Sequence, residues 1–309
     1  MEQPEAILIA GPTASGKSAL AVALARRVGG TVVNADSMQV YDGLRILSAR
    51  PAVDEMGGVE HRLYGHVPPD APYSAGVWLR EVEALLPELR VRGRIPVFCG
   101  GTGLYFKALL GGFDDLPEIP STIRERWRAR MAGEGPAALH RVLAGLDPEA
   151  AARLRPSDPQ RILRALELFE TTGAPLGQLQ RGAGAGLVEG AKALKLVLTP
   201  DRALLRERIA RRFDAMLAEG AAEEAEAFSA RPGAATGLAA NAIGVAELAR
   251  MRAGELTPIE ARDLSVTRTR QYAKRQETWF RHQFDETWLR FSDPAEALAA
   301  LGPRLPGLV

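Results

Sequence analysis

Residues 11–18 read Gly-Pro-Thr-Ala-Ser-Gly-Lys-Ser, which matches the phosphate-loop pattern G-x-x-x-x-G-K-[ST] in full. The apolar run Ala-Ile-Leu-Ile-Ala precedes it at 6–10, and Ala-Leu-Ala-Val-Ala-Leu follows it at 19–24. A buried strand, a glycine-rich turn and a helix N-terminus in this order direct backbone N–H groups at an anion. The alternative is a loop that only caps a helix, but the complete pattern in this setting favours a phosphorylated ligand.

Each part of the loop has an expected task. The glycines at 11 and 16 allow the tight turn, Lys17 reaches the terminal phosphate, and the Ser18 hydroxyl can hold Mg²⁺. We expect the ligand to contact the whole loop, which consists of Gly11, Pro12, Thr13, Ala14, Ser15, Gly16, Lys17 and Ser18.

The composition excludes several classes of protein. Of the 309 residues, 46% are apolar and 25% are charged, so the chain is neither disordered nor membrane-like. No apolar run approaches the ~20 residues of a membrane span, and the acidic start at 1–5 argues against a signal peptide. The single cysteine, Cys99, excludes an internal disulfide and a thiolate zinc cluster, and it falls in an apolar run that predicts core packing. We therefore expect a cytoplasmic protein that does not contact a membrane.

Strands and helices alternate over the first 110 residues. We expect strands at 6–10, 31–35 and 95–99, with helices near 17–28, 74–91 and 102–110. This alternation predicts an α/β fold, a P-loop NTPase-like (nucleotide-kinase-like) parallel sheet with flanking helices. Ligands of such sheets bind at the carboxyl ends of the strands.

The character of the chain changes after residue 112. Pro117 and Pro120 interrupt it, helical segments rich in Ala, Leu and Arg follow to about 173, and 182–186 reads as a flexible connector. We interpret 113–190 as an all-α insertion domain within a core made of 1–112 and 191–309. A strand at 195–199 returns to the sheet, and the later helices are expected at 201–219, 221–229, 242–253, 258–283 and 294–301.

The acidic residue Asp36 follows the second predicted strand, which is an unusual position for an ATPase. The strand at 95–99 ends in Gly100-Gly-Thr-Gly103 without the aspartate that usually holds Mg²⁺ there, whereas Asp36 follows the second strand. In small-molecule kinases the end of the second strand faces the acceptor, so we expect Asp36 to contact a second substrate. The alternative role for Asp36 is a helix N-cap.

Basic residues are clustered although the net charge is only +1. They gather within 124–130, 153–164, 206–212 and 268–281, whereas acidic residues gather within 219–226. Such segregation suits a polyanionic partner, and solvated helix faces with i,i+4 ion pairs are the alternative for any one cluster.

Seven motifs occur in the order seen in one family. They are the loop at 11–18, Asn34-Ala-Asp-Ser-Met-Gln-Val-Tyr41, Tyr73-Ser-Ala75, Gly93-Arg-Ile-Pro-Val97, Gly100-Gly-Thr-Gly-Leu-Tyr-Phe106, Asp158-Pro-Gln-Arg-Ile-Leu-Arg-Ala165 and Lys274-Arg-Gln-Glu-Thr-Trp279. Over nearly its whole length the chain resembles the bacterial tRNA dimethylallyltransferases, also called tRNA isopentenyltransferases, of the IPP transferase family.

The resemblance implies a reaction. The family transfers a dimethylallyl group from dimethylallyl diphosphate to the exocyclic N6 amine of the adenine 3′-adjacent to the anticodon in tRNA, releasing diphosphate. Lys17, Ser18 and Mg²⁺ would stabilise the leaving diphosphate, Asp36 would accept a hydrogen bond or proton from the amine, and Thr102 would contact the same nucleotide. Arg212, and with it Arg208, resembles the family arginine that reaches the diphosphate, although surface ion pairing is an alternative.

The resemblance also implies a tRNA interface. The adenine must leave its stack to react, and the residues matching the family's tRNA contacts are Asp36, Ser37, Met38, Gln39, Thr102, Arg124, Gln160, Arg161, Ile162, Leu163, Arg164, Lys274 and Arg275. We expect Trp279 to pack. The segment Asn241-Ala-Ile-Gly-Val-Ala246 departs from the family pattern, because it lacks the aromatic and basic residues usual after its Ile-Gly pair.

Three alternatives stay open. An enzyme that prenylates free adenine nucleotides would not need the arginine-rich insertion. A small-molecule kinase is supported only by the phosphate loop and fold, and an RNA-binding module with a nucleotide switch would not need Asp36 and Thr102. We expect the tRNA anticodon stem-loop and dimethylallyl diphosphate as partners, and a monomeric protein.

Overall fold

The computed structural model describes residues 4–112, 116–179, 186–234, 237–301 and 305. The chain forms two compact units, one made of Met1–Leu110 with Leu187–Val309 and the other of Gly111–Gly186. The second unit begins two residues before the predicted 113–190 and ends four residues earlier than predicted. The chain has already rejoined the first unit at Val188, whose N–H donates to the Leu109 carbonyl (3.2 Å). Except for Gly186, the predicted connector at 182–186 lies outside the described residues.

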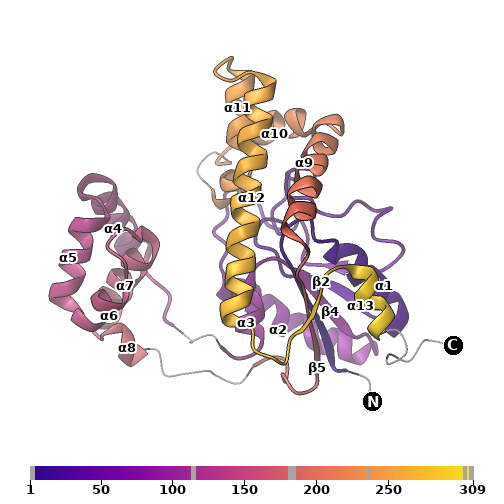
Figure 1. Ribbon diagram of the computed structural model, residues 1–309. Coiled ribbons are helices and arrows are strands. Elements are labelled where there is room, and N and C mark those ends of the chain that lie inside the picture. Colours follow the sequence, from indigo (N-terminus) through magenta and orange to yellow (C-terminus); the bar gives the residue numbers. More distant parts are fainter. Residues whose placement is uncertain (1–3, 113–115, 180–185, 235–236, 302–304, 306–309) are drawn as a thin grey trace. The chain divides into compact units, whose positions relative to one another are not determined.

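A six-stranded parallel sheet organises the first unit, in the order β3-β2-β4-β1-β5-β6 (Figure 1). The strands are β1 (Ala6–Ala10), β2 (Thr31–Asn34), β3 (His61–Arg62), β4 (Pro96–Gly100), β5 (Ala193–Leu198) and β6 (Leu289–Phe291). The four predicted strands are confirmed as β1, β2, β4 and β5. The short strands β3 and β6 were not predicted, because two or three residues are too few to show a periodic pattern.

Helices cover both faces of the sheet. The helical elements of this unit are α1 (Lys17–Val28), α2 (Ala75–Val91), α3 (Gly103–Leu109), α9 (Arg202–Ala218), α10 (Ala221–Ser229), η1 (Leu238–Asn241), α11 (Val245–Arg252), α12 (Pro258–Gln283) and α13 (Pro294–Leu301). On one face α1 and α13 pack against the apolar side chains of β1, β4 and β5, and Cys99 is buried there as predicted. On the other face Trp78 of α2 packs edge-on against Phe98 and stacks on Tyr105 of α3. The predicted α/β fold is confirmed.

Helix α12 is the longest element and runs beside α9 (Figure 1). It starts at a capping box, in which the Thr257 side chain accepts from the Glu260 amide while Glu260 reaches back to the Thr257 amide, with Pro258 at the first helical position. Its packing against α3, α9 and α11 brings residues near 270–280 back to the sheet that begins the chain.

The second unit is all-helical, as predicted. It contains α4 (Ser121–Glu134), α5 (Pro136–Leu146), α6 (Pro148–Arg153), α7 (Pro159–Thr172) and α8 (Leu176–Leu179). Trp127, Leu139, Leu143, Ile162 and Leu166 form a core of its own. In neither unit does any described helix have the length and apolar character needed to cross a membrane.

Candidate active site

The loop at 11–18 joins β1 to α1 and has the backbone of an anion cradle. Gly16, immediately before α1, has φ of 89°, and Ala14 also adopts a left-handed φ of 64°. The first turn of a helix leaves its N–H groups without partners in the helix, so the start of α1 presents several of them at the loop. The buried Ser15 hydroxyl has no hydrogen-bond partner among the described residues. The loop therefore keeps polar groups available for a ligand.

Two desolvated cations lie at this loop. The Lys17 ammonium donates to the Pro12 carbonyl (3.3 Å), and the Arg212 guanidinium, from α9, donates to the Thr13 hydroxyl. Burial lowers the pKa of both side chains, and the nearby Asp36 carboxylate opposes the shift in each case. Two half-buried cations beside a single carboxylate leave an excess of positive charge that favours binding of an anion.

Asp36 follows β2 and uses its two carboxylate oxygens differently. One oxygen accepts from the Met38 amide (2.9 Å), while the Asp36 amide donates to the side chain of Asn34 (2.8 Å). No hydrogen bond occupies the other oxygen, Oδ2, among the described residues. No helix begins at this position, so the alternative role of Asp36 as a helix N-cap is wrong. Asp36 instead stabilises a turn with one carboxylate oxygen and leaves the other for another partner.

Thr102 joins the turn after β4 to the turn after β2. Its hydroxyl accepts from the Ser37 amide (3.0 Å) and donates to the Ser37 hydroxyl (3.3 Å), while its own amide donates to the Ala35 carbonyl (3.2 Å). The close approach requires Gly100, because any Cβ there would overlap the Ala35 carbonyl. Asp36, Ser37 and Thr102 are thus brought together at the carboxyl ends of neighbouring strands, as the sequence predicted.

Gln276 is the residue that sequence reasoning missed. Its side chain is 5% exposed, accepts from the Thr13 amide (2.9 Å) and donates to the Gly101 carbonyl (3.0 Å), so it ties the phosphate loop to the turn after β4. A Cβ on Gly101 would overlap it. Ala273, Gln276 and Phe280 share the i, i+3, i+7 spacing of a buried stripe, and an amide in such a stripe needs internal partners. This spacing could have identified Gln276 from the sequence as a buried amide with partners inside the protein.

Tyr272 and Trp279 lie beside Gln276 on the same helix. Burial and the neighbouring Asp36 carboxylate raise the pKa of Tyr272, and interactions with the Gln276 and Thr102 side chains oppose the shift. The Trp279 ring packs edge-on against Phe280 and Phe284, as predicted, and covers Gly103, where a Cβ would overlap the ring. This face of α12 thus forms a wall of the site.

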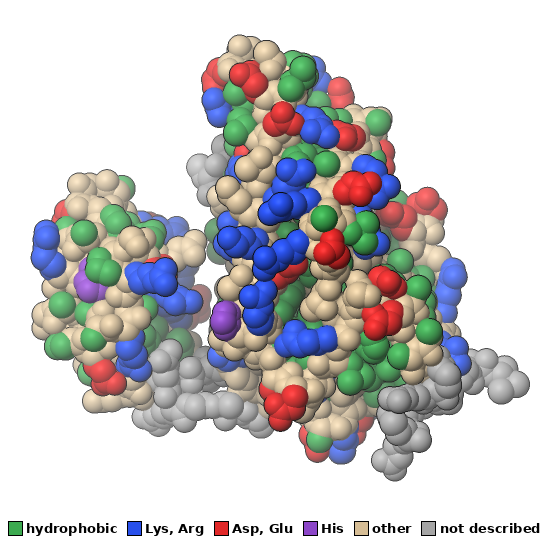
Figure 2. All heavy atoms as spheres, viewed as in Figure 1, with side chains coloured by type: hydrophobic (Ala, Val, Ile, Leu, Met, Phe, Trp, Pro, Cys, Tyr) green, Lys and Arg blue, Asp and Glu red, His purple; other side chains and the backbone are tan. Residues whose placement is uncertain are grey.

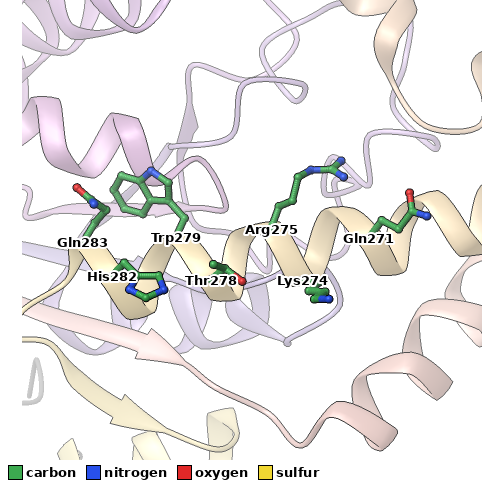
Figure 3. Close-up of a pocket in the computed structure, with 7 residues that line it drawn as sticks. All are labelled: Gln271, Lys274, Arg275, Thr278, Trp279, His282 and Gln283. Atoms are coloured by element: carbon green, nitrogen blue, oxygen red, sulfur yellow. The ribbon is translucent and has the colours of Figure 1, made fainter. Parts of the chain in front are cut away.

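The adjoining face of α12 lines an open groove of about 540 Å³ (Figure 3). The predicted Lys274 and Arg275 both line it, together with Gln271, Thr278, Trp279, His282 and Gln283. The Arg275 guanidinium lies over the Tyr272 ring, 5.8 Å from its centroid. The groove is basic and carries an aromatic ring, a combination that suits nucleic acid.

Two other predicted residues near Asp36 are partly buried. Gln39 donates through its side-chain amide to the carbonyls of Ser48 and Ala49 (both 3.0 Å), so that group already holds a loop together. Met38 is half-buried in the turn that Asp36 closes.

The remaining predicted residues lie in the second unit. Gln160 and Arg161 are exposed at the start of α7, and among the described residues the Arg161 guanidinium has a single, long ion pair, with Asp158 (3.7 Å). Arg164 is half-buried, and burial lowers its pKa; Arg124 is also partly buried and donates to the Ile119 carbonyl (3.4 Å). Ile162 is completely buried, and Leu163 packs against the same core. The i, i+3, i+4 pattern of α7 turns the Ile162 side chain into this core, and the expected tRNA contact of this residue stays a prediction.

A metal ion would find few protein ligands here. Among the described residues, no three His, Cys, Asp or Glu side chains are grouped to hold one. The exposed Ser18, at the start of α1, is a suitable oxygen ligand, and Mg²⁺ commonly takes its other ligands from water and substrate phosphates. The residues present fit a metal that arrives with a diphosphate.

Comparisons with known proteins give one answer over the whole chain. The profile of the family described as IPP transferase matches residues 39–283, and that of the isopentenyl transferase family matches 4–67. A Sinorhizobium medicae protein named tRNA dimethylallyltransferase is 58% identical over 294 residues, covering 95% of this chain and 96% of the relative. A Rhizobium meliloti protein of the same name is 57% identical over 290 residues, covering 94% and 96%.

Two solved structures that resemble this chain are also tRNA isopentenyl- and dimethylallyltransferases. The full-length tRNA isopentenylpyrophosphate transferase of Bacillus halodurans is 33% identical with a TM-score of 0.68, covering 99% of this chain and 97% of the other. A eukaryotic dimethylallyltransferase acting on tRNA has a TM-score of 0.81 at 26% identity, covering 97% and 77%. With the phosphate loop, the Asp36 turn and α12 assembled as described, the chain belongs to the IPP transferase family.

Proposed function

We propose that this protein is a tRNA dimethylallyltransferase, which moves a dimethylallyl group from dimethylallyl diphosphate to N6 of the adenine 3′-adjacent to the anticodon. The observation that carries the proposal is that the Gln276 side chain links an anion-binding site to the turn beside Asp36 and Thr102. Gln276 holds the anion-binding loop with one end of its amide and the turn beside Asp36 and Thr102 with the other. The two sites have the polarity that a diphosphate leaving group and an amine nucleophile require.

The phosphate loop binds the diphosphate of the prenyl donor. Lys17, Arg212 and the amides at the start of α1 contact its oxygens and stabilise the charge that develops as it leaves. Because these groups are positioned before the reaction, little reorganisation accompanies bond breaking.

Asp36 and Thr102 act at the adenine. The free Oδ2 of Asp36 accepts the proton of the N6 amine, and Thr102 positions the base. The N6 nitrogen forms a bond to C1 of the prenyl group, the C1–O bond breaks, and its electron pair leaves on the diphosphate. Asp36 takes up the amine proton, so no water needs to be activated.

We propose Mg²⁺ as the metal, and the Ser18 hydroxyl would be its protein ligand. When bound, it neutralises charge on the leaving group. The protein side chains described above perform the other tasks.

The tRNA is bound by basic residues of both units. Lys274 and Arg275 line the α12 groove, and Arg124, Gln160, Arg161 and Arg164 lie on or near the surface of the second unit. The adenine leaves its stack to reach Asp36, with Ser37, Met38 and Gln39 beside it. We propose that the enzyme works in the cytoplasm, where its tRNA substrate is found. We also propose that it acts as a monomer, because one chain supplies all the residues of the proposed site.

One experiment separates this function from its alternatives. The protein is incubated with labelled dimethylallyl diphosphate and, separately, with tRNA, AMP or ATP. We expect label in tRNA with release of diphosphate, and none in the nucleotides. Label in AMP or ATP would identify an enzyme acting on free nucleotides, and phosphoryl transfer from ATP to a small acceptor would identify a kinase.

A further inference from the structure

A second basic groove lies between α9 and α12. It encloses about 350 Å³, and its floor is formed by Leu205, Ile209 and Ala273. Its walls carry Arg202 and Arg206 from α9 and Arg270 and Lys274 from α12, opposed by the single carboxylate of Glu277. Figure 2 shows Lys and Arg side chains gathered over this part of α9 and α12.

Three of the four cations of this groove have no ion-pair partner among the described residues. Arg206, Arg270 and Lys274 have no ion pair or side-chain hydrogen bond among the described residues, and Arg202 only approaches Glu277 (3.9 Å). Elsewhere on α9 and α12, the arginines at 211, 262 and 268 each contact a carboxylate. The groove therefore carries four cations against one carboxylate, an excess of positive charge that an anion would compensate.

The arrangement of the charges suits a polymer better than a compact anion. Arg202 and Arg206 are four residues apart on one wall, and Arg270 and Lys274 are four residues apart on the other. Each pair is thus spaced by about 6 Å along its helix, a spacing that can follow successive phosphates of a nucleic acid strand. Thr267 and Gln271 add groups that can hydrogen-bond to phosphates or ribose hydroxyls.

The groove lies away from the reaction centre. On an α-helix, Arg270 and Lys274 are rotated roughly 120° and 160° from Gln276, whose side chain contacts the phosphate loop. A nucleotide in the groove is therefore not the adenine that reaches Asp36. Gln271 and Lys274 also line the first α12 groove, so a single strand could pass from one groove to the other.

We infer that the α9–α12 groove binds sugar–phosphate backbone of the tRNA outside the nucleotides that enter the active site. This inference rests on the proposed function. It adds Arg202, Arg206 and Arg270 to the tRNA-binding residues and extends the RNA interface onto α9.

The test is a pair of double variants. Arg206→Gln/Arg270→Gln should raise the Kd for full-length tRNA about tenfold at low salt, because two phosphate contacts are lost. The slope of log affinity against log salt should become shallower by roughly 1.4 to 1.8, since each phosphate contributes about 0.7 to 0.9. The KM for dimethylallyl diphosphate and kcat at saturating tRNA should stay within about twofold of the parent.

The matched control is Arg80→Gln/Arg90→Gln, which removes two exposed, unpaired arginines from α2 and the same net charge. Equal tRNA affinities and salt slopes in the two double variants would overturn the inference. A second measurement uses calorimetry with inorganic diphosphate in a Lys17→Ala background, in which the phosphate loop is weakened. If the groove substitutions abolish diphosphate binding there but leave the tRNA affinity unchanged, the groove binds a small anion and the inference is overturned. A parent that does not modify tRNA would refute the proposed function itself, whereas a parent that modifies tRNA with unaffected groove variants would refute this inference alone.

Discussion

At the scale of single residues, Asp36 has a structural task and a proposed chemical task that a substitution can separate. Asparagine keeps an oxygen for the Met38 amide but loses the anionic acceptor. We expect Asp36→Asn to lower single-turnover prenyl transfer by ~10²–10⁴, the usual contribution of a general base. Affinities for both substrates should stay within a few fold, and stability should fall by about 1 kcal/mol or less, because the asparagine oxygen still accepts from the Met38 amide. Rapid-quench kinetics and thermal melting on one preparation test both points, and a near-normal chemical step would remove Asp36 from the catalytic residues.

Lys17 offers a second test, at the diphosphate end. Replacing it by alanine removes a desolvated cation from the phosphate loop while leaving α12 and the second unit unaltered. We expect Lys17→Ala to weaken dimethylallyl diphosphate binding and to lower turnover by ~10²-fold or more, as for loss of one preorganised charge. Binding of tRNA should be unchanged. Lys107→Ala, at an exposed lysine of α3, is the control, and an unaltered affinity for the prenyl diphosphate would refute the role of Lys17.

Gln276 tests whether α12 positions the phosphate loop. Gln276→Met keeps the length of the side chain but leaves the Thr13 amide and the Gly101 carbonyl without their partner. We expect the KM for dimethylallyl diphosphate to rise and kcat to fall, each by about tenfold, because the loop loses its position. Ser265→Ala, which removes a buried hydroxyl bonded only within the same helix, should change melting temperature without changing either constant. If Gln276→Met behaves like Ser265→Ala, Gln276 serves stability alone.

At the scale of elements, the sequence predicted those that local patterns determine and missed those that depend on contacts with distant residues. The loop between β1 and α1 could be predicted because strand, turn and helix follow each other within 6–28. Strands β3 and β6 exist through hydrogen bonds to β2 and β5, which lie far away in the sequence, and their own residues carry no signal. The same holds for Gln276, whose partner Thr13 is 263 positions away. The motif around it was visible in the sequence, but its contact required the fold.

Helix α7 gives a prediction at this scale. It turns Ile162 into the core of the second unit and leaves Arg161 exposed with a weak partner. We expect Arg161→Ala to raise the KM for tRNA several-fold and to reduce the salt slope by about 0.7 to 0.9, with dimethylallyl diphosphate binding unchanged. Adding Arg164→Ala should increase the effect. Arg141→Ala, at an exposed and unpaired arginine of α5 in the same unit, is the matched control; an equal effect of both single substitutions would indicate general electrostatics only.

At the scale of the whole molecule, the second unit can be removed. It has its own core, and the chain on either side of it is joined by the bond from the Val188 amide to the Leu109 carbonyl, so a short glycine linker can replace 113–185. The phosphate loop, Asp36, Thr102 and Gln276 all belong to the remaining unit. We therefore expect the shortened protein to fold and to bind dimethylallyl diphosphate with nearly parental affinity, while its KM for tRNA rises at least tenfold, because the proposed contacts of α7 are lost. Calorimetry with the diphosphate verifies that the core is intact before tRNA kinetics are measured. An intact core with a parental KM for tRNA would show that the second unit does not bind the substrate, and α9 and α12 would then have to supply the whole interface.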